Sequence, residues 1–191
     1  MRCVTAPKPQ ASRSRKRLVV PFASSSPVVS IEIVWVRPVV GSSTRTRRPR
    51  TSGPVSEPVE FVDLDDLIDL ARALLGDPPP IRDIGLLGSA VARPQTTVSG
   101  EDAYPDLFTK AAALLHSIVN NHALVDGNKP LGWLATAVFL DLDGVSVTVI
   151  SNDEVYDLVI DVAANRADVE HIANELRRLT GDATWSAKLG A

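Results

Sequence analysis

Apolar residues recur at helical spacing through most of residues 59–181. The clearest stripe lies in residues 64–75, where leucine, isoleucine and alanine fall three or four positions apart. Asp63 precedes this stripe as a candidate N-cap, and Gly76 follows it, with the run DPPP directly after the glycine. Because proline cannot continue a helix, the pattern predicts a helix with both ends defined.

Four later segments show the same spacing and predict further helices. A capping-box pattern, S-x-x-E, begins at Ser151, and Asp168 is a candidate N-cap for the last helix, which should end near Gly181. A shorter helix is expected near residues 82–91. Together these stripes predict an all-α domain. The four segments occupy residues 106–121, 130–142, 151–164 and 168–179.

Two segments between the predicted helices lack helical periodicity. Residues 92–105 contain a β-branched pair and Gly100, which predicts an exposed loop or hairpin. Residues 145–150, VSVTVI, follow an Asp-Gly turn and have the composition of a strand, with a buried connector as the other interpretation. Neither segment changes the predicted all-α class.

The first 58 residues differ in composition from the rest of the chain. They hold eleven Lys and Arg against two Asp and Glu, a net charge of +9, whereas residues 59–191 carry a net charge of −12. Ser and Pro are frequent here, and there is too little apolar surface to offset the entropy of ordering, so residues 1–58 are predicted to be a disordered basic segment. Such an arm suits nucleic acid or an acidic partner, but interleaved aromatic residues are lacking.

A reading frame that begins too early explains this segment better than a targeting peptide does, because no apolar core of about 7–15 residues precedes a cleavage site. The hypothesis is that native synthesis starts near Val59, which a GUG start codon would encode as methionine. The chain then divides into residues 1–58, one domain at 59–181, and a tail at 182–191. The single Cys3 forms no intrachain disulfide, and no segment suits a membrane span, so a cytoplasmic protein is expected.

The residues HALVDGNKPLGW, at positions 122–133, predict a helix, loop, helix motif. The loop residues open the second helix, where backbone N–H groups lack intrahelical partners and the helix dipole favours an anion. Gly127 permits a close approach or a positive φ, Asn128 supplies a short polar side chain or a cap, and Lys129 adds a positive charge. The motif therefore predicts a phosphate site, and Pro130 fits the first turn of the second helix.

Two further residues of the motif are candidates for the chemistry of group transfer. Asp126 is a candidate ligand for Mg²⁺, which binds one or two carboxylates together with substrate phosphates. His122 is the candidate general base, because imidazole is suited to taking a proton from an attacking hydroxyl at neutral pH. The other histidines are expected at the edge of the core (His116) and in water (His171). The motif thus favours a nucleotide-using transferase.

These residues resemble the motif of the Fic/Doc family, most closely that of the Doc (death-on-curing) toxins, H-x-F-x-D-[AG]-N-K-R. We judge that the likeness covers residues 59–180. Fic enzymes proper carry glycine where Lys129 stands and transfer AMP, so the lysine favours Doc. The resemblance implies a Fic/Doc-type helical bundle in which residues 92–105 form a small flap that grips a protein target beside the active site. The matching positions are His122, Asp126, Gly127, Asn128 and Lys129.

The same resemblance implies a Doc-like toxin of a toxin–antitoxin pair. Such an enzyme transfers the terminal phosphate of ATP, with Mg²⁺, to a threonine of elongation factor Tu, and a partner antitoxin neutralises it. His122 would be catalytic and Asp126 would bind the metal. Gly127, Asn128 and Lys129 would bind the phosphates of the nucleotide. Nucleic acid is expected only indirectly, through an antitoxin complex.

Three positions depart from the family pattern. Pro130 stands where the family has arginine, Leu124 replaces the motif phenylalanine, and Gly88 in LLGSA stands where a glutamate is expected. An arginine that neutralises charge during phosphoryl transfer is worth about 10³–10⁵ in rate in other enzymes. Weakened activity is therefore expected.

Three alternatives remain open from the sequence. The first is a catalytically inactive Doc homologue that serves as an antitoxin-binding partner through an apolar surface near residues 59–75 or the flap. The second is AMP transfer of the Fic type, which Lys129 disfavours. The third is a plain helical scaffold in which Asp126 and Lys129 are solvated loop charges.

Overall fold

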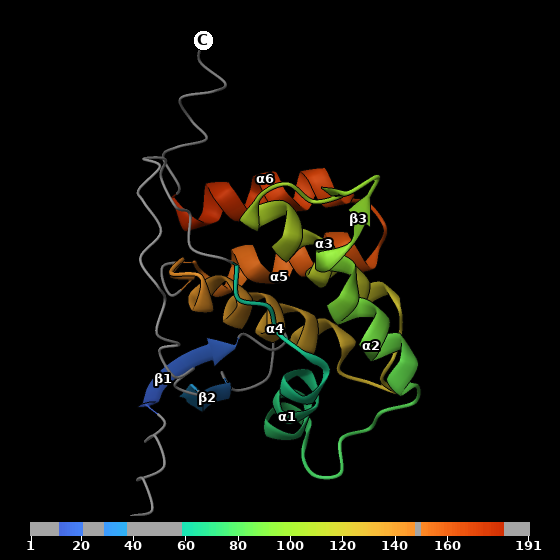
Figure 1. Cartoon of the computed structure of the whole chain (residues 1–191). Helices are drawn as coiled ribbons and strands as arrows, with labels where there is room; N and C mark the ends of the chain where they lie inside the picture. The colour runs from blue at the N-terminus through green and yellow to red at the C-terminus, as the bar shows by residue number, and fades with distance from the viewer. Residues whose placement is uncertain (1–11, 21–28, 38–58, 148–149, 182–191) are drawn as a thin grey trace, which may run out of the picture.

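The computed structural model describes residues 12–20, 29–37, 59–147 and 150–181. Within 59–181, six α-helices enclose one hydrophobic core, which confirms the predicted all-α class (Figure 1). None of the helices in the described part of the chain has the length and apolar character that a membrane span requires. The helices are α1 (Leu64–Leu75), α2 (Ile84–Ala92), α3 (Leu107–Asn120), α4 (Asn128–Leu142), α5 (Asn152–Ala163) and α6 (Val169–Thr180).

Local capping fixes where these helices begin. The Asp63 side chain accepts a hydrogen bond from the backbone N–H of Asp66, which closes a capping box at the start of α1. Ser151 forms the predicted capping box with Glu154 at α5, and Asp168 caps α6. Asp106 caps α3 through the N–H groups of Phe108 and Thr109. The cap predictions made for α1, α5 and α6 are therefore confirmed.

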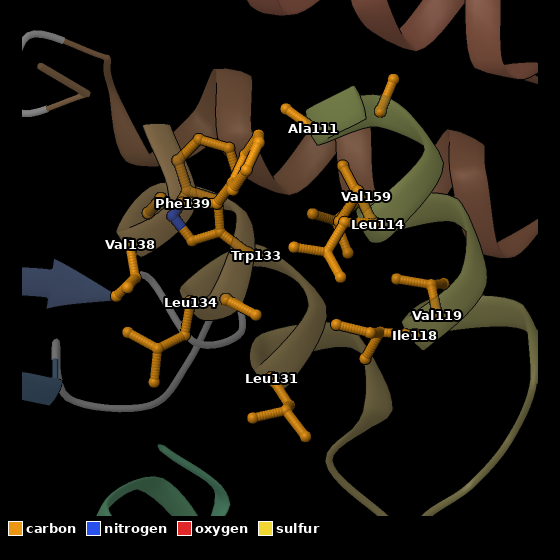
Figure 2. Close-up of a cluster of buried hydrophobic side chains, with 14 of the residues drawn as sticks. Ala111, Leu114, Ile118, Val119, Leu131, Trp133, Leu134, Val138, Phe139 and Val159 are labelled. Atoms are coloured by element: carbon orange, nitrogen blue, oxygen red, sulfur yellow. The ribbon is translucent and has the colours of Figure 1, made fainter. Parts of the chain in front are cut away.

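Helix α3 lies at the centre of the bundle and packs against α4, α5 and α6. Figure 2 shows Leu114 and Ile118 of α3 pointing toward α4, and Leu131 and Leu134 of α4 belong to the same buried core. A Cβ atom at Gly132 would lie 2.8 Å from a methyl carbon of Val119. The glycine thus lets the two helix backbones approach closely at the end that carries the motif.

The predicted loop or hairpin at 92–105 is a short hairpin. After a 3₁₀ turn, η1 (Arg93–Gln95), strand β3 (Thr97–Val98) pairs antiparallel with β4 (Glu101–Asp102) (Figure 1). Residues 102–106, which we call the hairpin stem, then lead into α3. The structure thus selects the hairpin from the two predicted possibilities, and Gly100, named in that prediction, lies between its strands.

Three basic side chains hold the hairpin stem. Lys110, only 5% exposed, lies 2.6 Å from an Asp102 carboxylate oxygen and also donates to the Tyr104 carbonyl at 2.6 Å. Arg93 donates to the Tyr104 hydroxyl at 2.8 Å. Arg177 of α6, 9% exposed, lies 2.6 Å from Asp106. The stem is thus attached to α3, α6 and η1 by charged groups, of which Lys110 and Arg177 are nearly buried.

The remaining segments fall partly outside the described residues. Residues 145–147 belong to no helix or strand of the described chain, and Val147 is buried, as a connector requires, while positions 148–149 of the suggested strand lie outside the described range. In the first 58 residues the backbones of β1 (Ser12–Val20) and β2 (Val29–Arg37) pair antiparallel. The disordered segment, the start near Val59 and the tail at 182–191 stay predictions.

Candidate active site

The predicted helix, loop, helix motif is present, and its loop follows α3 directly. Helix α3 ends at Asn120, and His122 has a φ of 51°, the left-handed region that non-glycine residues seldom adopt. Its side chain is exposed to solvent. The backbone reversal at His122 ends the helix and starts residues 121–127, which we call the motif loop.

Gly127 sets the start of α4. It has a φ of 91°, and a Cβ atom there would lie 2.7 Å from two methyl carbons of Leu75. Both the backbone conformation and the approach of α1 therefore favour glycine. Helix α4 begins at the next residue, with no side chain capping its N-terminus. The first turn of α4 is accordingly left open toward solvent, as the phosphate prediction requires.

Asn128 has a structural task in addition to its place at the helix start. Its side-chain oxygen accepts from the Leu124 N–H at 2.9 Å, and its amide nitrogen donates to the Leu124 carbonyl at 3.0 Å. The expected cap or phosphate contact from this side chain is therefore replaced by a brace across the loop. The buried Leu124 anchors the brace in the core.

The backbone donors of the loop are also distributed differently from the expectation. The Gly127 N–H, expected to face phosphate, donates instead to the Asp126 carboxylate at 2.7 Å. Among the described residues, the N–H groups of Asn128 and Lys129 have no partner within the protein, and the first helical bond of the turn is made by Leu131. The amides left open to a ligand at this helix start are therefore those of Asn128 and Lys129.

A second segment supports the motif loop from outside. Ile81 and Leu124 form an isolated β-bridge, and the Val125 N–H donates to the Pro80 carbonyl at 2.9 Å. The Arg82 guanidinium donates to the carbonyl oxygen of His122. Residues 80–83, which we call the brace segment, were not identified from the sequence. Periodicity gives no signal for a contact between residues 40 positions apart.

All five predicted site residues line one cavity of about 510 Å³. Neither Leu124 nor Gly88 lies on its wall, and among the described residues the hairpin contributes nothing to it. The cavity is lined by Val119, His122, Val125, Asp126, Gly127, Asn128, Lys129, Pro130, Trp133, Val155, Tyr156, Val159, Ile160 and Ala163.

Helix α5 forms the apolar wall opposite the motif loop. Val155 and Val159 are buried, whereas Tyr156 is 45% exposed, and the buried Trp133 of α4 also lines the cavity. This wall also went unpredicted, since the stripe on α5 indicates only that it faces the interior. The cavity therefore has a polar end, formed by the loop, and an apolar side of α5 residues.

The polar end suits a phosphate group with a divalent cation. Lys129 is exposed and carries a positive charge next to the two free amides. One carboxylate oxygen of Asp126 accepts from Gly127, and the exposed carboxylate keeps its second oxygen for a ligand. Magnesium commonly takes one carboxylate and completes its shell with phosphate oxygens and water, so the residues present fit this ion.

Pro130 occupies the third position of α4, where its missing N–H removes no helical hydrogen bond. The first-turn placement of this proline is thus confirmed. Its ring is buried and offers neither a charge nor a donor to the cavity. Among the described residues that line the cavity, Lys129 is the one Lys or Arg.

His116 lies at the edge of the core, as predicted, and takes part in the contacts behind the stem. Its Nδ1 accepts from Arg93 at 3.1 Å, and the same guanidinium donates to Ser117 at 2.9 Å. Burial, reinforced by the positive charge of Arg93, lowers the pKa of His116 below its ordinary value. His171 is exposed on α6, also as predicted.

An imidazole, a carboxylate and the open N-terminus of a helix on one cavity, within a helical bundle, define a site of the kind that nucleotide-using transferases have. Comparison with known proteins agrees. The Fic/DOC family description matches residues 61–140. The chain is 47% identical over 118 residues to the protein named Toxin Doc of Mycolicibacterium smegmatis, a match covering 61% of this chain and 91% of that protein.

A second relative is more distant. The chain is 31% identical over 126 residues to the protein named Protein kinase doc of Escherichia phage P1, covering 66% of this chain and 95% of the phage protein. The chain therefore belongs to the Fic/DOC family. The family resemblance drawn from the motif is confirmed, and with it the helical fold that carries a small hairpin.

Proposed function

We propose that this protein is a Doc-like toxin that transfers a phosphate group from ATP to a hydroxyl of a translation factor, elongation factor Tu. The observation that carries the proposal is that His122, Asp126 and Lys129 line one cavity at the open N-terminus of α4. The names of the two relatives, a toxin and a protein kinase, support the two parts of it.

ATP would bind with its phosphates at the polar end of the cavity. The amides of Asn128 and Lys129 and the Lys129 ammonium group would hold the phosphate oxygens, and Asp126 would hold Mg²⁺ against them. When bound, the ion would stabilise the negative charge on the phosphate oxygens. The apolar wall of α5 leaves room for the nucleoside, because the cavity of about 510 Å³ extends along it.

His122 is the proposed general base. Its imidazole takes the proton of the target hydroxyl while the hydroxyl oxygen bonds to the γ-phosphorus. The bond from that phosphorus to the bridging oxygen of ADP breaks, and ADP leaves with the electron pair. Positioning and charge stabilisation supply most of the rate in such transfers. The loss of an arginine at position 130 should therefore slow turnover far more than it affects folding.

The partners follow from the same proposal. A protein antitoxin would neutralise the toxin, because toxins of this kind act in toxin–antitoxin pairs. The target is in the cytoplasm, and so the toxin would act there. Contact with nucleic acid would be indirect, through the antitoxin complex.

The test compares transfer of label from α-labelled and γ-labelled ATP to purified elongation factor Tu by the full chain, with Pro130→Arg and His122→Ala beside it. Label from the γ position alone, dependent on Mg²⁺ and lost in His122→Ala, is the expected result. Label from the α position would make the protein an AMP transferase. No label from any variant would contradict transferase activity altogether.

A second candidate rests on Pro130. Because the proline supplies no charge to the cavity, the protein is alternatively an inactive homologue that retains only antitoxin binding. Label that appears only in Pro130→Arg would identify a disabled kinase. Unchanged antitoxin affinity in His122→Ala, with no label in any variant, would support the binding-only function.

A further inference from the structure

We propose that Arg82 is a positioning residue that holds His122 in its working orientation. Its guanidinium donates to the carbonyl oxygen of His122, although the two residues are 40 positions apart in the chain. The inference rests on the proposed function, in which His122 is the base. Arg82 does not line the cavity, so it would act through His122 and not on the nucleotide.

The backbone on both sides of this contact is fixed. The N–H groups of Arg82 and Asp83 both donate to the Ala123 carbonyl, at 2.9 and 3.1 Å. Asp83 in turn caps α2 by accepting from the Gly85 N–H at 2.8 Å. Hydrogen bonds to Ala123 and to the start of α2 therefore hold the backbone from which the Arg82 side chain extends.

His122 needs such support because of its backbone. Its φ of 51° is a left-handed conformation that costs free energy for any residue with a Cβ and persists only where the surroundings impose it. The next peptide is imposed by the bonds to Ala123, Leu124 and Val125 from the brace segment. The His122 carbonyl itself is held by Arg82. The direction of this carbonyl fixes ψ, and φ and ψ together orient the Cα–Cβ bond from which the exposed imidazole extends.

Arginine suits this task better than lysine does. Its guanidinium is planar and always charged, and its fixed fork of donors makes a directed, charge-assisted bond to a carbonyl. The arginine side chain is long enough to reach from the brace segment to the His122 carbonyl, just after the end of α3. Lysine would keep the charge but lose the planar geometry, so Arg82→Lys should restore only part of the function.

The test uses the full chain with Arg82→Ala, Arg82→Lys and Arg72→Ala. Arg72 is a matched control, an exposed arginine of α1 that is paired with Asp69 at 2.8 Å and does not line the cavity. Displacing a catalytic group by an ångström can cost about 10²-fold. We therefore expect kcat for phosphate transfer to fall about 10- to 100-fold in Arg82→Ala with KM for ATP unchanged, partly restored in Arg82→Lys and unaffected in Arg72→Ala.

A double variant separates positioning from a direct role. If Arg82 acts through His122, adding Arg82→Ala to His122→Ala should cause no further loss of rate. An additive loss, or a raised KM for ATP with kcat intact, would overturn the proposal. If the protein with proline at 130 labels too slowly to measure, the same series is made in Pro130→Arg.

A second readout does not depend on catalysis. The ¹³Cα and ¹³Cβ chemical shifts of His122 report its left-handed backbone, and they should move toward averaged values in Arg82→Ala and stay unchanged in Arg72→Ala. Unchanged His122 shifts in Arg82→Ala would overturn the proposal even if phosphate transfer is observed. Altered shifts in a protein that transfers no label in any variant would retain the structural role of Arg82 while rejecting the proposed function.

Discussion

The two ends of helix α3 are held by different kinds of interaction. At its N-terminal end, the hairpin stem is fixed by ion pairs from nearly buried Lys110 and Arg177. At its C-terminal end, the motif loop is fixed by backbone hydrogen bonds from the brace segment and by the Asn128 side chain. The cations that hold the stem are nearly buried, whereas the charged side chains of the loop are exposed and line the cavity.

The difference shows how one helix serves stability at one end and chemistry at the other. A buried cation must keep its partner, since an unpaired charge away from water is costly. A loop braced by its backbone leaves its side chains available for a ligand. Substitutions in the stem should therefore lower the stability of the fold, and substitutions in the loop should mainly change binding and rate.

The largest stability effect is expected from Asp106→Asn in the stem. Asparagine still caps α3, but the charge paired with Arg177 at 2.6 Å is lost. We expect the free energy of unfolding to fall by about 1–3 kcal/mol, since a bond to a largely buried charged group is weakened. Urea unfolding measures this change in free energy.

Asp126→Asn is the matched loop variant. It should lower the free energy of unfolding by under about 0.5 kcal/mol while weakening Mg²⁺-dependent ATP binding. Equal losses of stability in the two variants would remove the distinction between the two ends of α3.

Gly127→Ala should cause the next largest loss of stability, and it tests the close approach of Leu75 to the motif loop. The positive φ strains any residue with a Cβ, and the Leu75 methyl groups must also move, so a cost of about 1–2 kcal/mol is expected. Gly100→Ala in the hairpin is the control, with a φ of 88° and nothing within 4 Å of the added Cβ. A Gly100→Ala loss as large as that of Gly127→Ala would show that Leu75 contributes nothing.

His122→Gly in the motif loop should raise the stability of the fold while lowering the rate of transfer. Glycine relieves the left-handed strain, so we expect a gain of up to about 1 kcal/mol in the free energy of unfolding. The rate of label transfer should fall by about 10²–10⁴-fold because the base is removed. His122→Ala lacks the relief of strain and serves as the control. A destabilised His122→Gly would mean that the imidazole supports the loop.

The smallest expected effect is a pH dependence of the free energy of unfolding that arises from His116, which contacts Arg93. The pKa of His116 is lowered in the folded protein, by burial first and then by Arg93, while Asp168 acts in the opposite sense. The neutral imidazole accepts from Arg93, so this contribution is present above the ordinary pKa of 6.5 and is lost as the pH falls through the folded value. Urea midpoints between about pH 5 and 8 should decline toward acid, and less so in His116→Gln. An equal decline in both proteins would assign it to other groups.

Much of this architecture could be predicted from sequence. The spacing of leucine and alanine predicts the helices, and Asp63, Ser151 and Asp168 mark their beginnings, because capping depends on residues two or three positions apart. The loss of periodicity and Gly100 predicted a loop or hairpin at the right place, and the structure shows a hairpin. The residues of the motif were found together because they are contiguous in the chain.

The distribution of hydrogen bonds within the motif could not be predicted. An asparagine at a helix start is compatible with capping, with phosphate contact or with the brace to Leu124, and only the positions of the neighbouring backbone groups select among them. In the same way, Gly127 was identified as permissive, but the Leu75 methyl groups that exclude a Cβ belong to a helix some fifty residues earlier in the chain.

The sequence by itself determined the helices, the caps at Asp63, Ser151 and Asp168, the family motif and the chemical groups at its loop, because each depends on a few neighbouring residues. Only the tertiary structure decided which groups meet. It brought Arg82 to His122 across 40 positions and Asp106 to Arg177 across 71, and it set α5 against the loop to enclose a cavity. Such contacts arise when apolar faces of separate helices pack into one core, and local sequence patterns carry no information about which distant polar groups that packing brings together.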